Sequence, residues 1–427
     1  MTNNKSNNIK NNENKFTYYG WLIVALSFLT LSTHGSARMS FSLFQVALID
    51  EYGWSRGALG GAFSLMMVLY ALIGPFIGSF FEKYGARSVI PLGSIIIGIG
   101  LSGGYFISAI WHVYFLIGIF LSIGQACSGF AMHSALMPLW FQKRRGLATG
   151  IVFSGPGIGA IFLIPALEYI MRVYGWRNAT LFFGLLLILI IGPSNFIFMR
   201  NKSKDIDFEK ENEKSKNIDF KGQKRTSISE ILRVVQTIKI SKQFWILGFM
   251  NFSIGIFSNT IISQLQIYMI DVKYSMSNAA IILGMSGFFR ITGSLFSGWI
   301  SDFIGRKYTM AIVSTISLSS VVLLILIPFL EVNSYWGYFF AIIFGIGGGG
   351  LTSCYAAQSA DTFQGKQLGI IMGLLQIFYG VGGATGPLLA GFNHDITGNY
   401  MISFIVLIIM LSGMILGCFS LSNLSKK

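Results

Sequence analysis

Two arginines in this sequence stand inside long apolar segments, where a positive charge is costly. Arg290 lies midway along GMSGFFRITGSLFSGWI, and Arg38 lies inside WLIVALSFLTLSTHGSARMSFSLF. A charge at the bilayer centre costs roughly 3 kcal/mol on insertion-derived scales, so such a residue usually faces a watery cavity or a partner. Read along the sequence, the 17 Asp and Glu residues fall in tails, loops or helix ends. The missing countercharge predicts that an anionic substrate supplies it.

The guanidinium group is suited to binding a carboxylate. Its planar fork pairs with both carboxylate oxygens, and a low-dielectric cavity strengthens that pair. We therefore predict that Arg290 binds substrate, and that Arg38 supplies a second positive charge. The alternative for Arg290 is a helix-packing arginine bonded to backbone carbonyls. The alternative for Arg38, 17 residues past Trp21, is a side chain that reaches the outer interface.

Several residues are weaker candidates for the same site. His34 stands one helical turn before Arg38 and is expected on the same face, where a histidine could bind substrate or carry a proton. The alternative is a packing histidine with satisfied hydrogen bonds. Phe130 and Tyr355 occupy related positions in the two halves, and either line the cavity or pack between helices. The remaining candidates are polar or aromatic residues of other spans: Tyr70, Asn259 and Gln376.

The composition predicts an all-α membrane protein. Of 427 residues, 53% are hydrophobic and 11% are charged, whereas an ordinary soluble domain has about 25% charged residues. The 50 glycines are typical of close helix approach in lipid. Twelve apolar stretches are each long enough to provide the ~20 residues that span a bilayer. Their bounds are 19–47, 57–81, 88–109, 112–139, 147–171, 178–199, 244–270, 277–300, 309–330, 335–360, 367–392 and 399–421.

The net charge of +14 is not one basic patch, and we expect no nucleic-acid partner. With the N-terminus placed inside, 25 of the 31 Lys and Arg residues fall in cytoplasmic segments. The positive-inside rule then predicts that both termini lie in the cytoplasm. We expect the protein in the plasma membrane. No cleavable signal is visible, and the Asn-rich tail 1–18 is predicted to be disordered. The basic residues left outside are Arg56, Arg172, Arg177 and Lys273.

The spans divide into two six-helix halves, 19–199 and 244–421. A charged cytoplasmic linker, 200–243, joins them, and a short tail, 422–427, follows. The halves repeat: GSFFEKYGAR at 78–87 matches GWISDFIGRK at 298–307, with an offset of 220 positions that also sets Tyr70 opposite Arg290. Two such halves, related by an axis along the membrane normal, predict a substrate site at midplane between them.

The two loop segments resemble the signature of the major facilitator superfamily, Gly-x-x-x-Asp-(Arg/Lys)-x-Gly-Arg-(Arg/Lys). The first copy departs at Glu82 and Ala86, and the second at Phe303. The resemblance covers about 19–421 and implies the facilitator fold, with twelve helices in two pseudo-symmetric halves. It also implies that these loops act as gate latches rather than substrate ligands. The implied gating residues are Gly78, Glu82, Lys83, Gly85, Arg87, Gly298, Asp302, Gly305, Arg306 and Lys307.

A closer resemblance connects the chain with monocarboxylate transporters and oxalate:formate antiporters. The segment WFQKRRGLATG at 140–150 looks like the stretch between their fourth and fifth helices, and YGW at 19–21 fits the start of their first helix. The resemblance implies that Arg290 binds the substrate carboxylate. Two departures are notable: Ser286 stands where animal-type transporters have an aspartate linked to proton coupling, and 368–392 contains no lysine, unlike the antiporters.

These observations predict a secondary transporter of small organic anions, working by alternating access. Monocarboxylates such as lactate, pyruvate or formate come first, with oxalate/formate-type dicarboxylate exchange as the alternative. A drug or metabolite exporter of the same fold is less favoured. A coupled proton or counter-anion is expected, and a monomer is the expected functional unit. Four scattered histidines and three cysteines within spans give no metal, cofactor or catalytic constellation, so an enzyme is not expected.

Overall fold

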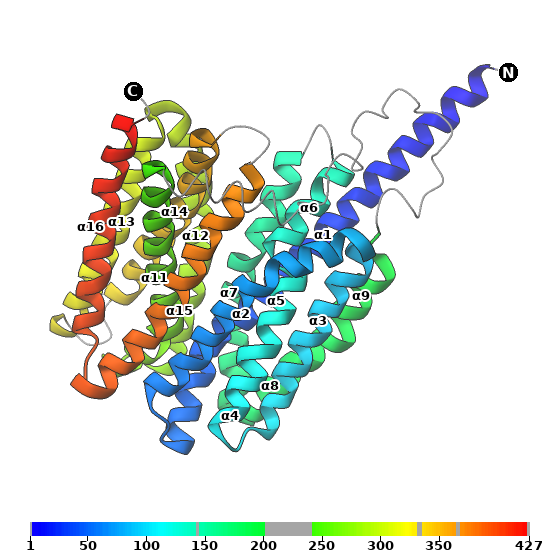
Figure 1. Cartoon of the computed structure of the whole chain (residues 1–427). Helices are drawn as coiled ribbons and strands as arrows, with labels where there is room; N and C mark the ends of the chain where they lie inside the picture. The colour runs from blue at the N-terminus through cyan, green and yellow to red at the C-terminus, as the bar shows by residue number, and fades with distance from the viewer. Residues whose placement is uncertain (1, 142–144, 201–240, 331–334, 364–367, 425–427) are drawn as a thin grey trace.

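The structure is all-helical in the residues it describes. This computed structural model describes residues 2–141, 145–200, 241–330, 335–363 and 368–424, and every regular element in these ranges is a helix (Figure 1). Eleven helical segments there are long and apolar enough to cross a membrane. The remaining predicted span, 367–392, is α15, Leu368–Thr397, a helix of 30 residues. The predicted all-α fold is confirmed.

The first half contains four long helices and two interrupted spans. The long helices are α1 (Thr2–Tyr52), α2 (Arg56–Tyr84), α3 (Ala86–Gly103, continued by η1, Gly104–Phe106) and α7 (Arg145–Tyr174). The fourth span comprises α4 (Ile110–Val113), η2 (Tyr114–Leu121), α5 (Ser122–Ser128) and α6 (Phe130–Trp140), and the sixth comprises α8 (Trp176–Leu186), η3 (Leu187–Ile191) and α9 (Gly192–Phe198). Residues 2–18 continue α1, although the sequence predicts disorder there; a helix satisfies its own backbone hydrogen bonds, so a polar segment can extend one.

The second half repeats the plan with longer, less interrupted helices. Its elements are α11 (Lys242–Asp271), α12 (Met276–Ile304), α13 (Arg306–Leu326), η5 (Ile327–Phe329), α14 (Trp336–Thr362), α15 and α16 (Met401–Leu424). Most of the predicted linker, 201–240, lies outside the described residues.

The sequence repeat is matched by repeated local structure. Ser55 caps α2 by accepting a hydrogen bond from the backbone N–H of Ala58. Ser275 caps α12 in the same way, by accepting one from the backbone N–H of Asn278, and both bonds are 3.2 Å long. A serine oxygen satisfies one of the free N–H groups at a helix start. At the other end, Gly85 and Gly305 have φ of 77° and 86°, a region in which a side chain is strained.

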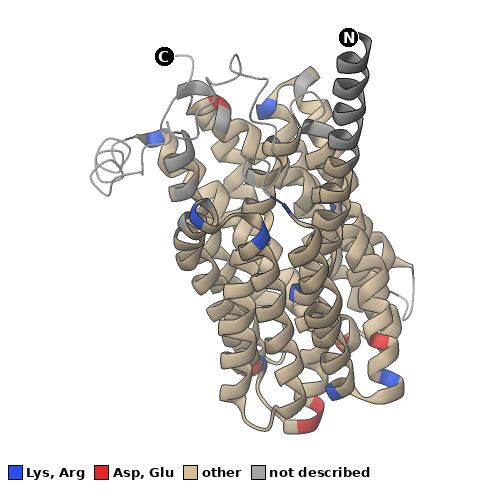
Figure 2. Cartoon of the chain, turned by 90° about the vertical axis from the view of Figure 1, so that its right-hand side faces the viewer, with Lys and Arg blue, Asp and Glu red and all other residues tan. Residues whose placement is uncertain are grey.

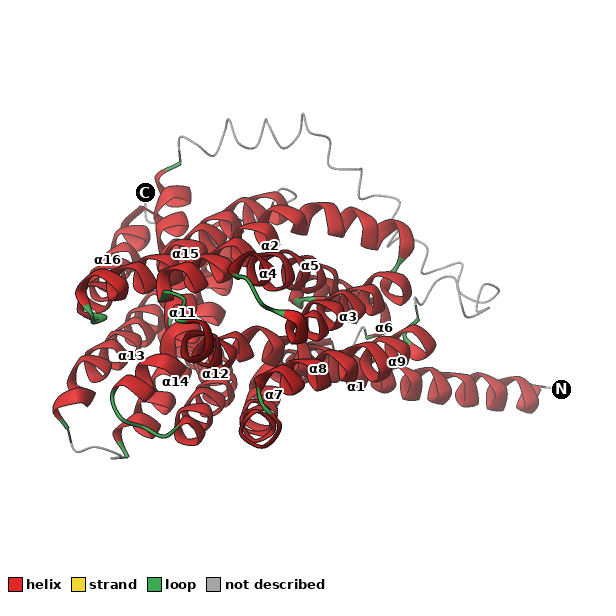
Figure 3. Cartoon of the chain, turned by 90° about the horizontal axis from the view of Figure 1, so that it is seen from below, coloured by secondary structure: helices red, strands yellow, loops and turns green. Residues whose placement is uncertain are grey.

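The two halves lie side by side (Figures 1 and 3), and both chain ends lie at the same end of the bundle (Figures 1 and 2). Among the described residues, the most extensive contacts between the halves are those of α1 with α11, α2 with α15, and α7 with α12. The larger of two clusters of buried apolar side chains includes Phe63, Phe257 and Phe344 and so spans both halves, whereas the smaller cluster lies within the first half. Charged residues are sparse between the two ends (Figure 2), so the few that lie there stand out.

Candidate functional site

Arg290 lies at the centre of α12, fourteen residues after Met276 and fourteen before Ile304. Its side chain is partly buried, and its Nη1 is buried without a hydrogen-bond partner. Its Cζ lies 6.0 Å from the ring centroid of Phe344 in α14. The alternative of a guanidinium saturated by backbone carbonyls does not describe this geometry, because one donor nitrogen remains free.

The glycine run Gly347–Gly350 explains how α14 comes so close to α12. A Cβ on Gly348 would lie 3.2 Å from Arg290 Nη1, and a Cβ on Gly349 would lie 2.0 Å from the Arg290 carbonyl oxygen. Side chains at these positions would push the two helices apart. The run therefore serves helix packing beside the arginine, as expected of glycines in apolar spans.

Arg38 reaches from the first half into the second. Its Nη2 donates a hydrogen bond to Oδ1 of Asn259 in α11, and its Cζ lies 5.9 Å from the ring centroid of Phe63 in α2. Its Nε is buried without a hydrogen-bond partner. Asn259 is fully buried and also donates to the backbone oxygen of Gly255, at 2.9 Å. Arg38 thus points into the bundle and away from the outer interface.

Tyr379 of α15 connects the two arginines, and sequence reasoning missed it. It interacts electrostatically with Arg38 and Arg290 and lies close to Asn259. Tyr70 of α2 interacts with Arg38 as well as with Tyr379. The two arginines also interact unfavourably with each other. Four helices, two from each half, thus bring two cations and two phenols together, and we call these four residues (Arg38, Tyr70, Arg290 and Tyr379) the central cluster.

No carboxylate neutralises the central cluster within the described part of the chain. The ion pairs there involve Arg56, Arg177, Arg306 and His394, and neither Arg38 nor Arg290 takes part in one. Two cations that repel each other at a partly buried position are stabilised when an anion binds between them. The central cluster can therefore bind an anion reversibly.

His34 does not join this cluster, although the sequence placed it on the face of Arg38. Its Nδ1 lies 2.7 Å from the Ser128 hydroxyl, its Nε2 lies 3.1 Å from the Ser94 hydroxyl, and the residue is 1% exposed. The short imidazole remains among helices of its own half, whereas the long arginine side chain extends to α11. The two side chains therefore have different partners, and the geometry of His34 is that of the packing histidine given as its alternative.

The other aromatic and amide candidates lie in different environments. Phe130 is 46% exposed and its ring centroid lies 5.0 Å from that of Phe153, while Tyr355 is 6% exposed. Gln376 is exposed and lies three residues before Tyr379, on the same helix face. Phe130 and Gln376 are thus exposed and Tyr355 is largely covered, and the expectation that they line the substrate cavity stays a prediction.

The end of the bundle opposite the chain termini is closed by charged side chains. Arg56 of α2 forms a two-point pair with Asp271 of α11, with Nη2 to Oδ1 at 2.8 Å, and donates to the hydroxyl of Tyr400 at 2.8 Å. Asp395 of α15 accepts from the backbone N–H groups of Arg56 and Gly57, at 3.0 and 2.7 Å, and so caps α2. We call these residues, with His394, the outer-end cluster, because they lie at the end of the bundle farthest from the chain termini.

Further hydrogen bonds join the two halves in the region that separates the central cluster from the outer-end cluster. Ser42 accepts from the backbone N–H of Gln266 at 3.2 Å, and Ser64 donates to the backbone oxygen of Ala384. A Cβ on Gly60 would lie 2.7 Å from the Pro387 oxygen, so α2 and α15 touch closely there. The halves are therefore held together from midplane to the outer end.

Comparison with known proteins identifies the family. The family model of the Major Facilitator Superfamily matches residues 26–357 and 247–426. The chain belongs to the Major Facilitator Superfamily. An uncharacterised MFS-type transporter of Bacillus subtilis, YcxA, is 24% identical over 396 residues, covering 91% of this chain and 92% of that protein. Monocarboxylate transporter 13 of Rattus norvegicus is 22% identical over 388 residues, covering 91% and 85% respectively.

Solved facilitator structures share the fold. A crystal structure of a bacterial homologue of the human lysosomal transporter Spinster, in an inward-facing and occupied conformation, matches with a TM-score of 0.72 at 14% identity. The match covers 94% of this chain and 96% of that one. The resemblance to the superfamily drawn from the loop signatures is confirmed, and this facilitator is a membrane transporter rather than an enzyme.

The signature loops of this facilitator lie at the end of the bundle that holds the termini. Arg306 of the second copy pairs with Asp361 of α14, with Nε to Oδ2 at 3.2 Å, and also bonds to the Ser301 hydroxyl. Arg87 of the first copy donates to the backbone oxygen of Phe196 at 3.3 Å. The described contacts of these loops lie within each half, and the side chains of Glu82 and Asp302 lie outside the described residues.

The remaining signature residues are glycines and lysines. A Cβ on Gly78 or Gly298 would meet nothing within 4 Å. The Lys83 and Lys307 ammonium groups lie 5.0 and 4.6 Å from the ring centroids of Tyr84 and Phe419, within cation–π range.

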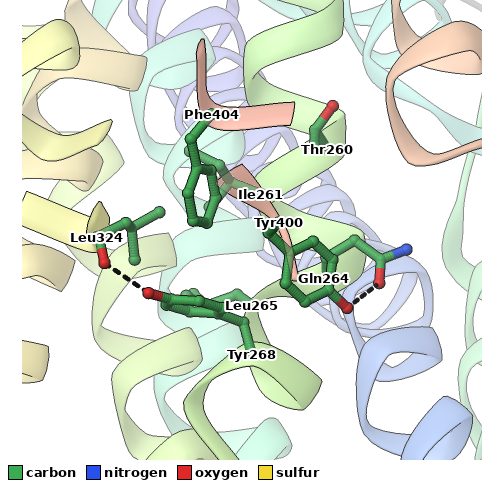
Figure 4. A pocket seen from close by; sticks show the side chains of 8 residues that line it. All are labelled: Thr260, Ile261, Gln264, Leu265, Tyr268, Leu324, Tyr400 and Phe404. Atoms are coloured by element: carbon green, nitrogen blue, oxygen red, sulfur yellow. Dashed lines mark hydrogen bonds between the residues drawn. The ribbon is translucent and has the colours of Figure 1, made fainter. Parts of the chain in front are cut away.

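A small pocket in the second half is distinct from the central cluster (Figure 4). Tyr268 donates to the backbone oxygen of Leu324 at 2.5 Å, and Tyr400 donates to Gln264 Oε1 at 3.2 Å. The pocket contains neither arginine, so it is not the candidate anion site. The described residues hold no group of three or more potential metal ligands. The pocket is lined by Thr260, Ile261, Gln264, Leu265, Tyr268, Leu324, Tyr400 and Phe404.

Proposed function

We propose that this facilitator moves small organic anions across the plasma membrane by alternating access, with monocarboxylates such as lactate, pyruvate or formate as the first class. One observation carries the proposal: Arg38 and Arg290 converge at the centre of the bundle, and each retains a buried nitrogen without a hydrogen-bond partner. A carboxylate would provide the missing acceptors. The likeness to monocarboxylate transporters supports the same substrate class.

The geometry assigns different tasks to the two arginines. The Arg290 guanidinium has a free Nη1 and can offer its fork to both oxygens of a carboxylate. Arg38 is held by Asn259 and adds a second positive charge from the other half. The Tyr379 hydroxyl, close to both, can donate to the bound anion. Since the ligands come from both halves, anion binding favours their approach.

Alternating access follows from the two ends of the bundle. With the termini placed in the cytoplasm, the outer-end cluster closes the extracellular side, and the protein is in an inward-facing state. Opening that side requires separation of Arg56 from Asp271 and of Asp395 from the start of α2. Each half contributes ligands to the central cluster within a single chain, so the proposed functional unit is the monomer.

Exchange of dicarboxylates, as in the oxalate:formate antiporters, is the second candidate function. It is favoured by the presence of two cations at one position, because a dianion neutralises both. An exporter of cationic drugs is disfavoured, since Arg38 and Arg290 repel a cation. Whether a proton or a counter-anion accompanies the substrate distinguishes symport from exchange.

The function is tested with purified protein in proteoliposomes. A panel of labelled carboxylates is offered with and without a pH gradient, and with and without internal counter-anion. We expect saturable uptake of small monocarboxylates that Arg290→Gln abolishes. Uptake that requires an internal dicarboxylate would support the second candidate, and uptake of organic cations alone would contradict both.

A further inference from the structure

His394 of α15 lies among the charged residues of the outer-end cluster. It stands two residues past the predicted span 367–392, and its side chain is 20% exposed, so water outside the bundle reaches it. Its Nε2 lies 3.9 Å from Oδ2 of Asp271 in α11, and its ring centroid lies 4.8 Å from that of Tyr400. Histidine is the side chain that ordinarily gains or loses its charge between about pH 5 and 8, so this cluster contains a group that can respond to acidity.

Each helix that packs on α15 brings one polar group to His394. Within the described residues, α15 packs mainly against α2, α11 and α16. The first of these brings the Arg56 guanidinium, and the second brings the Asp271 carboxylate. Tyr400, the residue before α16, brings a phenol, and α15 itself adds the carboxylate of Asp395. The imidazole therefore faces one cation and two anions.

These charges are divided between the two halves. His394 and both carboxylates belong to the second half, whereas Arg56 belongs to the first. In this closed arrangement α2 binds both carboxylates: Arg56 Nη2 donates to Asp271 Oδ1 at 2.8 Å, and the backbone N–H groups of Arg56 and Gly57 donate to Asp395. Separation of the halves removes both sets of donors together. The imidazole then remains beside two carboxylates that have lost the partners supplied by α2.

The closed arrangement opposes protonation of His394. Burial and the nearby Arg56 guanidinium lower the pKa of His394 below its ordinary value, and the two carboxylates offset this only in part. When the halves separate, water returns to the imidazole and the guanidinium leaves, while the carboxylates stay. Each of these changes favours the imidazolium. The open state therefore binds the proton more tightly, so the closed state is favoured at high pH and loses stability as the pH falls.

We propose that His394 is a pH-sensitive switch in which a proton from outside replaces Arg56 as the cation beside Asp271 and Asp395, and so holds the outer end open. Hydronium transfers a proton to the imidazole and leaves as water, and the imidazolium N–H donates to the Asp271 carboxylate. Loss of the proton lets Arg56 pair again. The proton arrives from and returns to the same side. The physiological meaning rests on the proposed anion transport and orientation, but the link between protonation and opening needs no substrate.

The test measures the separation of the halves at the outer end as a function of pH. Tyr174, the last residue of α7, is 60% exposed, and Tyr335, just before α14 in the other half, is 88% exposed. Each is replaced by a cysteine that carries a nitroxide spin label, and the buried Cys127, Cys354 and Cys418 are replaced by alanine. Protein in lipid nanodiscs, without substrate, is frozen at steps across the range of about pH 5 to 8 in which histidine titrates. Pulsed electron paramagnetic resonance then gives the populations of short and long label separations.

We expect the ratio of long to short separations to rise as the pH falls, by up to about tenfold per pH unit, the limit for one linked proton. His394→Gln, which is neutral at every pH, should stay mostly closed and lose the response. His394→Lys, which is charged throughout the range, should favour the long separation at every pH. His112→Gln is the matched control, because Nδ1 of His112 accepts from the backbone N–H of Ser108 in the same half, at 3.1 Å; it should keep the wild-type response.

A His394→Gln protein that keeps the wild-type pH response would overturn the proposal, as would a His394→Lys protein that stays closed, or a response abolished by His112→Gln. Should His394→Gln fold poorly, Asp271→Asn provides a second test: it keeps the imidazole and removes the carboxylate that the bound proton would face, so the pH response must become shallower than in wild type. Failure of carboxylate uptake in wild-type protein would contradict the proposed substrate while leaving the distance measurement intact, so the two failures are distinguishable.

Discussion

Arg38 of α1 donates a hydrogen bond to Oδ1 of Asn259 of α11, and so joins the first helices of the two halves at the level of the central cluster. The contact is a charge held by a neutral amide. An anion can therefore displace Asn259 from the guanidinium without breaking an ion pair. Under the proposed function, this exchange would couple anion binding to a change in how the halves pack.

Replacement of Arg38 should discriminate between substrate charges. We expect Arg38→Gln to weaken monocarboxylate binding by about tenfold, or ~1.4 kcal/mol, and to weaken dicarboxylate binding more, because a dianion loses its second cation. Isothermal titration of both classes measures this. Asn259→Ala is the matched control: it removes the amide and keeps both cations, so it should preserve the relative affinity for dianions. Equal losses for both classes in Arg38→Gln would contradict a charge-binding role.

The Tyr379 hydroxyl should contribute to affinity through one hydrogen bond. We expect Tyr379→Phe to weaken carboxylate binding by at least about tenfold, since a hydrogen bond to a charged group contributes roughly 1.5–3 kcal/mol. Tyr268→Phe, another buried tyrosine of the second half whose hydroxyl bonds to Leu324, should leave affinity unchanged. Binding is measured by tryptophan fluorescence quenching. Equal affinities in wild-type and Tyr379→Phe protein would exclude the phenol from the site.

Loss of the outer ion pair should open the outer end. Arg56 and Asp271 have side chains 15% and 35% exposed, and a partly exposed pair contributes about 1 kcal/mol. A cysteine in place of Ser42, an α1 residue that is 1% exposed and contacts α11 of the other half, reports opening through labelling by an impermeant maleimide added outside. We expect Asp271→Asn to raise this labelling by roughly fivefold. Glu51→Gln breaks a pair within one half and should leave labelling low. No increase in Asp271→Asn would mean that the outer-end cluster does not hold the halves together.

The proposed orientation is tested by labelling two lysine positions. Lys307 lies at the start of α13, at the end of the bundle with the termini, and Lys273 lies between α11 and α12 at the opposite end. Lys307→Cys should be labelled only from the cytoplasm and Lys273→Cys only from outside. The reverse pattern would invert the topology, and labelling of both from one side would contradict the number of spans.

The sequence predicted the helical fold because spans, caps and turns are local. The serines that cap α2 and α12, and the left-handed glycines Gly85 and Gly305, each act on a neighbouring helix end. Arg38 and Arg290 were also predictable, since a charge in an apolar span is conspicuous. Their convergence needed only the expectation that two repeated halves meet at midplane.

Side-chain direction was less predictable, because it depends on helix rotation. Tyr379 is one of many aromatic residues in the apolar spans. The signal for it is its spacing of three residues from Gln376, which places a phenol and an amide on the same helix face. Glu168 of α7 is 4% exposed and accepts a hydrogen bond from Ser277 of the other half. It lies inside the predicted span 147–171, so the expectation that every acidic residue falls in a tail, loop or helix end is wrong there. His34 and Arg38 lie four residues apart on α1, yet their side chains differ in length and contact different partners.

Arg290→Gln tests the central claim most directly. At equal membrane expression and with unchanged thermal stability, we expect loss of carboxylate binding worth roughly 2–5 kcal/mol, as when one partner of a buried charge pair is truncated. Arg290→Lys should retain the charge and still transport poorly, because an ammonium lacks the two-point fork. Wild-type carboxylate uptake in Arg290→Gln would contradict anion binding at the central cluster, and would leave Arg290 as a residue that packs α12 against α14.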